Sequence, residues 1–238
     1  MSSNSPFERR SSADDGVIRP GPGAPVGGAV VRSDTRTVFG QTMFLVAITT
    51  GFTALGAYVG RDISGGLSLG LWLVAFVAIL GMSFARKAQN GALGMGLLFV
   101  VGLLLGMAIG PTISAYAALD GGAELLWQAG GLTALFIGAF GAVGWGTTRD
   151  LSGLARTAFW ALLALIVAGF VAMFVSIPGF NLLWSIVGLG IFSIFTMFDC
   201  QRLRTAGEDD ATMIALSIFL DVFNVFLFIL NLLGMSRD

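Results

Sequence analysis

Two apolar stretches near the C-terminus decide the fold: IFSIFTMFDCQRLRTAG (191–207) and ALSIFLDVFNVFLFILNLLG (215–234). Each has the composition of a membrane-spanning helix, which needs about 20 predominantly apolar residues. Each also carries one carboxylate, Asp199 in the first stretch and Asp221 in the second. A charged group in the middle of such a helix costs about 3 kcal/mol on insertion scales, so it normally faces the bundle interior and has a partner. The two aspartates are therefore the first candidates for a functional site.

The same apolar character extends over most of the chain. Hydrophobic residues make up 55% of the sequence and charged residues only 11%, where a soluble domain has about 25% charged residues. Seven apolar segments are expected, at residues 38–60, 66–85, 92–118, 127–147, 157–176, 180–203 and 212–235. Pro111 is expected to end or kink the third segment. The sequence predicts an all-α membrane protein, a seven-transmembrane-helix bundle over residues 37–238, preceded by a disordered cytoplasmic tail over residues 1–36.

The basic residues predict how this bundle is oriented in the membrane. If residues 1–36 lie in the cytoplasm, eleven of the thirteen basic residues lie there too, and only Arg61 and Arg237 lie outside. Cytoplasmic loops carry an excess of Lys and Arg. We therefore expect a cytoplasmic N-terminus and an external C-terminus.

The residue inventory excludes several classes of function. The chain has no histidine and one cysteine, so it lacks the commonest transition-metal ligand, the base of a rhomboid-type serine protease and any internal disulfide. Its formal net charge of −1 argues against a nucleic-acid partner. The only lysine, Lys87, is not on the last helix, where a retinal-binding protein needs one. Asp221 lies in IFLDVF, without the glycines of an intramembrane aspartyl protease, so we expect no enzyme and no cofactor.

The positions of the two aspartates predict that they share a site. A short hairpin joins the two last segments, which should make them antiparallel neighbours with both carboxylates in the cytoplasmic half and Asp221 the deeper one. Two carboxylates in a low dielectric cannot both ionise at low cost, so the pair would hold a proton and titrate as a unit. When ionised, the pair suits a hard cation such as calcium, which would compete with that proton.

Other interpretations of these residues remain open. Asp199 could pair with Arg202, three residues later on the same helix. Asp221 lies near Asn224 and Asn231, and this polar row could serve as hydrogen-bonding glue between helices. A basic side chain could also compete for the carboxylates, and Arg86 and Lys87 are the candidates, at the inner end of the second segment.

The motif FDCQRL (198–203) and the stretch at 215–234 closely resemble the C-terminal signature of the Bax inhibitor-1 family, also called the transmembrane Bax inhibitor motif family. LGMAIGPTISAY (105–116) and TTRDLSGLART (147–157) resemble it more weakly. The resemblance implies six helices around a central seventh, and a pH-dependent calcium leak sensed by an aspartate pair at Asp199 and Asp221. It also implies a basic latch on the second helix, for which Arg86 is the better match and Lys87 the fallback.

The chain departs from this pattern at Cys200, where a small polar residue is usual, and at Asn231, where many relatives have arginine. In a bacterial member, the resemblance implies the inner membrane as location and allows a membrane-bound quality-control protease as partner, besides the lipid bilayer, calcium and protons. A non-transporting adaptor of such a protease and a proton-coupled cation antiporter are the alternatives to a leak channel or transporter.

Overall fold

The structure of this protein, a computed structural model, describes residues 35–87, 90–172, 174–175 and 178–236. Within these ranges there are seven α-helices and no strand. The seven are α1 (Thr35–Val59), α2 (Gly65–Lys87), α3 (Gly91–Ala117), α4 (Gly122–Gly146), α5 (Ser152–Ala172), α6 (Phe180–Thr205) and α7 (Ala211–Met235). Each of them is long and apolar enough to cross a membrane, which confirms the predicted fold class.

The predicted segments match the helices, with corrections at three places. Helices α4 and α5 begin at Gly122 and Ser152, each about one turn before the predicted start. Their first turns contain Glu124 and Arg156, and such polar residues interrupt an apolar pattern without interrupting a helix. Of the two outcomes expected at Pro111, an end or a kink of the third helix, the end is wrong, because α3 continues to Ala117. Proline is tolerated in membrane helices when neighbouring groups satisfy the backbone that it frees.

The predicted tail over residues 1–36 lies outside the described residues, except for its last two positions. Thr35 and Arg36 already belong to the first turn of α1. Helix α1 therefore starts two residues before residue 37, while its candidate membrane span begins at Thr37.

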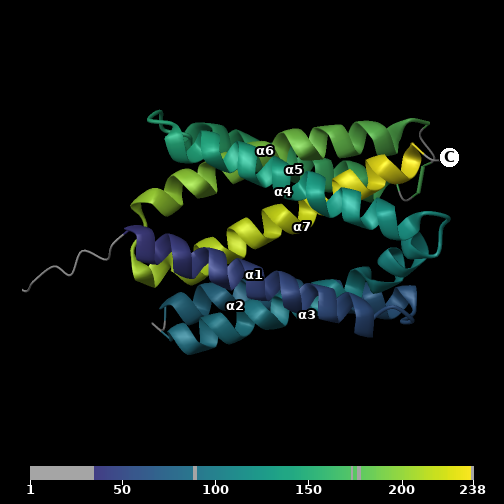
Figure 1. Ribbon diagram of the computed structural model, residues 1–238, viewed down its shortest axis with the longest axis horizontal. Helices are drawn as coiled ribbons and strands as arrows, with labels where there is room; N and C mark the ends of the chain where they lie inside the picture. Colours follow the sequence, from purple (N-terminus) through teal and green to yellow (C-terminus); the bar gives the residue numbers. More distant parts are fainter. Residues whose placement is uncertain (1–34, 88–89, 173, 176–177, 237–238) are drawn as a thin grey trace, which may run out of the picture. The chain divides into compact units, whose positions relative to one another are not determined.

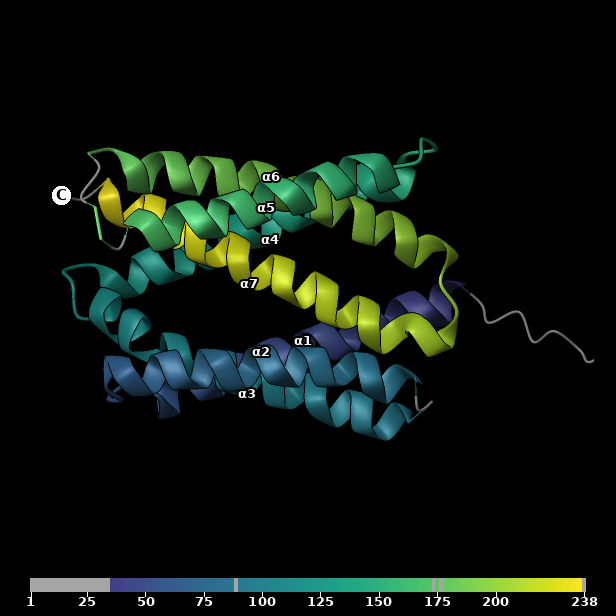
Figure 2. The ribbon, with the colours of Figure 1, turned by 180° about the vertical axis from the view of Figure 1, so that it is seen from behind.

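Helix α7 lies between two groups of helices. Helices α1, α2 and α3 pack together, and so do α4, α5 and α6, while α7 contacts α1, α3, α4 and α6 (Figure 1). Seen from behind, α7 crosses between the same two groups (Figure 2). Its buried residues belong to two apolar clusters. Phe219 and Phe223 pack in a cluster mainly with residues of α1, α2 and α3, and Leu230 packs in a second cluster with residues of α4 and α6.

Small residues determine how closely α1 and α3 pack. Gly102, Gly106 and Gly110 recur every four residues on α3, so they lie on one face of the helix. A Cβ atom added at Gly106 would overlap the backbone of Thr53 on α1, and one at Gly56 would overlap that of Leu103 on α3. Glycine at these positions lets the two backbones touch, which is the usual way for helices to associate in lipid.

Candidate functional site

Asp199 and Asp221 are both buried, on antiparallel helices that are in contact. Their relative exposures are 6% and 4%. Asp199 lies six residues before the end of α6 at Thr205, and Asp221 lies ten residues after the start of α7 at Ala211. At a rise of about 1.5 Å per residue, the two depths differ by about 6 Å along the helix axes. The charge of Asp199 nevertheless acts directly on Asp221.

The groups around the two carboxylates are small and polar. The hydroxyl of Ser217 on α7 interacts with Asp199, and Thr196 on α6 lies against Asp221. The Cys200 thiol lies close enough to interact electrostatically with the carboxylates of both Asp199 and Asp221. Its Sγ faces Gly141 on α4. Each aspartate is therefore met by a hydroxyl from the opposite helix.

One carboxyl oxygen of this group lacks a hydrogen-bond partner. Asp221 Oδ2 is buried and receives no hydrogen bond from any described residue. The Thr196 hydroxyl lies against this carboxyl group but donates to the carbonyl oxygen of Phe192 at 2.8 Å. A buried polar atom without a partner is costly, and such exceptions are concentrated at functional sites.

The predicted supporting residues lie on the same two helices but make few contacts with the carboxylates. Arg202 exerts a Coulombic influence on Asp199, yet no ion pair joins them among the described side chains. Asn224 donates to the carbonyl oxygen of Leu220 at 2.7 Å, a bond within α7. Asn231 is partly buried, ten residues beyond Asp221.

The predicted basic latch does not reach the carboxylates through Lys87. Its ammonium group lies 5.9 Å from the centre of the Phe84 ring on the same helix, and both side chains are exposed. The side chain of Arg86, the first candidate, lies outside the described part of the structure. The latch therefore stays a prediction.

The two carboxylates are a poor fit for a tightly held metal ion. No group of three or more Cys, Asp or Glu side chains that could hold a metal occurs in the described ranges. Calcium takes six to eight oxygen ligands in its protein sites, and here two carboxylates and two hydroxyls are at hand. Such a set suits a cation that stays briefly, as conduction requires.

The sequence reasoning missed Thr196 and Ser217. Each precedes its helix's aspartate by three or four residues, so it lies on the same face, and this spacing could have identified both. It also missed Gln201, which binds the loop between α4 and α5, and Arg204, which binds the end of α4. Gln201 donates to the carbonyl of Arg149 at 2.7 Å and accepts from the Leu151 N–H at 3.1 Å. Arg204 donates to the carbonyl of Trp145 at 2.9 Å.

Comparison with known proteins agrees with this architecture. Residues 35–238 match the model of the family described as inhibitor of apoptosis-promoting Bax1. The chain belongs to the Bax inhibitor-1 family. An uncharacterized membrane protein of Vibrio cholerae is 31% identical over 86% of this chain and 92% of its own length. An uncharacterized protein of Chlamydia muridarum is 32% identical, over 84% and 90% of the two chains.

A third relative has a more informative name. The inner membrane protein YbhL of Escherichia coli is 29% identical over 74% of this chain and 91% of its own length. Membership in this family and seven spanning helices make this chain an integral membrane protein whose environment is the lipid bilayer.

Proposed function

We propose that this protein is a pH-sensitive calcium leak channel or transporter, gated by the carboxylates of Asp199 and Asp221. The observation that supports it is the burial of two interacting aspartates on adjacent membrane helices, one of them with an unpartnered oxygen. Intramembrane carboxylates of this kind mark ion and proton pathways. A structural pair would be expected to have all its hydrogen bonds satisfied.

The chemistry of the proposed gate is a competition between a proton and a cation. With one proton shared, the pair carries one negative charge and attracts a divalent cation weakly. Loss of the proton doubles that charge, so the apparent calcium affinity rises with pH and falls as the solution is acidified. Asn224, Asn231 and Arg202 would adjust the polarity of the two helices, and Arg86 would act as the latch. The mechanism has no catalytic step and needs no cofactor besides the permeant ion.

The names of the relatives support a location for this activity. YbhL is called an inner membrane protein, and we propose the same membrane for this chain, with the N-terminus in the cytoplasm and the C-terminus outside. The pair would then lie in the cytoplasmic half of the bilayer, since α7 begins on the side where α1 begins.

Calcium flux into liposomes tests the proposal. Purified wild type, Asp199→Asn and Asp221→Asn are reconstituted, and uptake is measured against calcium concentration at pH 6, 7 and 8. We expect the half-saturating calcium concentration of wild type to rise as pH falls. Each substitution should remove most of this dependence, because one carboxylate no longer competes for a shared proton. Asp150→Asn, a change to an exposed carboxylate outside the pair, is the control and should behave as wild type.

The same experiment distinguishes the alternatives. Flux equal to that of empty liposomes, with all variants folded, would reject transport and favour an adaptor, with a membrane-bound protease as the partner to seek. Movement of calcium against its gradient, driven by an imposed pH gradient, would identify an antiporter instead of a leak.

A further inference from the structure

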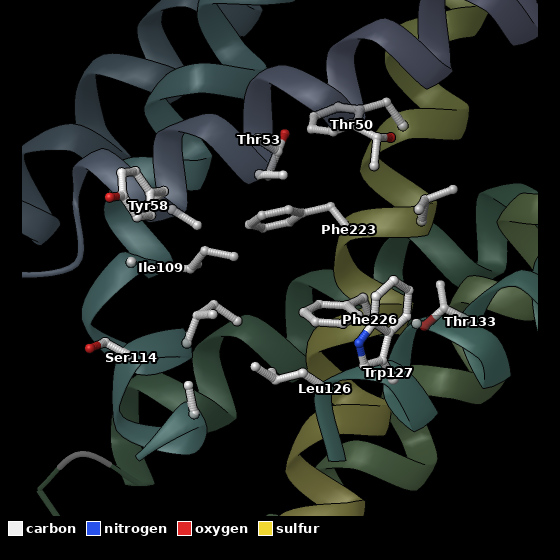
Figure 3. Close-up of a pocket in the computed structure, with 18 of the residues that line it drawn as sticks. Thr50, Thr53, Tyr58, Ile109, Ser114, Leu126, Trp127, Thr133, Phe223 and Phe226 are labelled. Carbon is white, nitrogen blue, oxygen red and sulfur yellow. The ribbon is translucent and has the colours of Figure 1, made fainter. Parts of the chain in front are cut away.

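A cavity of about 880 Å³ lies between α1, α3, α4 and α7. Tyr58, Ile109, Leu126 and Phe223, one from each of these helices, surround it (Figure 3). Its volume lies in the range of about 300–1,000 Å³ that is typical of sites for small molecules and cofactors. On α7 the lining positions are 219, 222, 223 and 226, which share the helix face opposite Asp221. The cavity is therefore separate from the carboxylate site.

The three threonines in the lining of this cavity have no free donor hydrogen. Thr50 and Thr53 on α1 donate their hydroxyl hydrogens to the carbonyls of Val46 and Thr49, at 2.9 and 3.0 Å. Thr133 on α4 donates to Ala129 at 2.7 Å. The hydrogens of these three hydroxyls are already used within their own helices, and the rest of the deep lining is almost wholly aliphatic or aromatic. An apolar occupant suits this interior far better than water or an ion.

The mouth of the cavity opens to the lipid. Two of its lining residues, Tyr58 on α1 and Trp127 on α4, are 66% and 83% exposed. Exposed apolar residues such as Leu55 and Leu135 cover the outer faces of both helices. The medium in front of the mouth is therefore hydrocarbon.

The length of the cavity matches one leaflet of a bilayer. Its lining on α1 runs from Thr50 to Arg61, which is about 16 Å at 1.5 Å per residue. Half of a hydrocarbon core of about 30 Å is about 15 Å. Thr50 lies near the middle of the membrane, and Arg61 follows the end of α1 at Val59, on the side where α7 also ends. Tyr58 and Trp127 lie near the same end, where interfacial aromatic residues are enriched.

Arg61 is the only formally charged residue of the lining, and it stands at the interfacial end. Its guanidinium lies 4.7 Å from the centre of the Tyr58 ring, and its Nε donates to Asp62 at 3.1 Å. Half of the side chain remains exposed, and arginine binds phosphate oxygens well. The cavity thus has an apolar interior of leaflet depth and a phosphate-binding group where a lipid phosphate would lie.

We propose that this cavity binds one membrane glycerophospholipid from the leaflet at the C-terminal end of α7, with an acyl chain between α1 and α4 and the phosphate against Arg61. An inserted helix from a partner or a second copy is a poorer fit. Such a helix carries no phosphate for Arg61 to bind at the interfacial end of the cavity. The proposal does not depend on ion transport.

Two neighbouring glycines on α4 provide a matched test. Gly130 lines the cavity, Gly131 does not, and a side chain at either would meet nothing within 4 Å. Delipidated protein is titrated with palmitoyl-oleoyl phosphatidylethanolamine, and binding is read by native mass spectrometry. We expect wild type and Gly131→Leu to bind one lipid per chain with equal affinity. Gly130→Leu should bind at least tenfold more weakly, because its side chain occupies the cavity.

A second variant tests the phosphate contact without changing the interior. The diacylglycerol with the same two acyl chains lacks the phosphate. Wild type should prefer the phospholipid over this diacylglycerol by about fivefold or more, and Arg61→Gln should lose that preference while binding diacylglycerol as wild type does. Equal binding by Gly130→Leu and Gly131→Leu, an unchanged preference in Arg61→Gln, or a lipid-free dimer of wild type would each overturn the proposal.

Discussion

Helices α1 and α3 associate in a different way from α6 and α7. Between α1 and α3, glycines at positions such as 56 and 106 bring backbone against backbone, and an added methyl group would overlap the neighbouring chain. Between α6 and α7 the contact is made by full side chains, including Phe192 against Phe228, with ring centroids 6.0 Å apart. The same contact contains two buried carboxylates. The α1–α3 interface is formed by close packing of backbone against backbone. The α6–α7 interface instead includes a buried carboxyl oxygen without a hydrogen-bond partner.

The difference shows where this fold gains stability and where it forgoes some of it. Close packing of small residues gives dispersion contacts, which drive association where both helices and lipid are apolar. A buried carboxyl oxygen without a hydrogen bond opposes folding, so its presence between α6 and α7 is better explained by function than by stability. Substitutions in the two interfaces should therefore have opposite effects on stability.

The largest effect is expected at the α1–α3 interface. Gly106→Ala places a methyl group into the backbone of Thr53, which cannot move aside as a flexible side chain would. We expect a loss of about 3 kcal/mol, the upper part of the usual range for overpacking. Thermal unfolding in detergent measures it. Gly96→Ala on the same helix is the control, since nothing lies within 4 Å of that position. Equal melting temperatures for the two variants would contradict the close packing.

A smaller effect of opposite sign is expected at the α6–α7 interface. Asp221→Leu removes an unsatisfied buried carboxyl and inserts an apolar group of similar size, so it should stabilise the protein by about 1–2 kcal/mol. Asp199→Leu should not, because it leaves the Ser217 hydroxyl without its partner. Unfolding by denaturant in detergent compares the two. A loss of stability in Asp221→Leu larger than in Asp199→Leu would show that Asp221 has a structural partner after all.

The smallest effect on stability is expected at Asp150, a carboxylate that already has hydrogen-bond donors. Asp150 Oδ1 accepts from the Ser152 N–H at 2.9 Å, at the start of α5. Hydrogen bonds from the Ser152 side chain and backbone hold the pKa of Asp150 below its usual value. Its contribution to stability is therefore complete above the unfolded-state pKa of about 3.9, and is lost as pH falls through the lower folded-state value.

The variant Asp150→Ala measures this contribution. Its melting temperature should lie slightly below that of wild type at pH 6, and the gap should close as the pH is lowered toward 2. A gap that persists in acid would mean that the carboxylate charge is not the stabilising feature. Asp150 thus gives the stability contribution of a carboxylate with hydrogen-bond partners, with which the contribution of Asp221 can be compared.

Much of the fold could be predicted from sequence because the bilayer constrains it strongly. A spanning segment must be apolar over about 20 residues, so each helix is visible by itself. The errors lie where this constraint is weak. Glu124 and Arg156 lie near helix starts that need not be apolar, and Pro111 lies inside α3, since membrane helices tolerate proline.

The candidate site could be predicted only in part. Asp199 and Asp221 were evident because a carboxylate in an apolar run is rare. Their surroundings were not, because the partners Thr196 and Ser217 are ordinary residues until the two helices are in contact. The cation–π contact of Lys87 with Phe84 was equally hidden, since a basic residue at a helix end can turn several ways.

The sequence by itself determined that the chain crosses a membrane with seven helices, and which two of them carry carboxylates. Hydropathy is a property of each segment alone, so it can be read without knowing any neighbour. Only the tertiary structure decided that Asp221 Oδ2 stays unpartnered, that glycines join α1 to α3, and that four helices enclose an apolar cavity ending at Arg61. These features are set by distances between side chains on different helices, which depend on how the helices pack and not on the composition of any one of them.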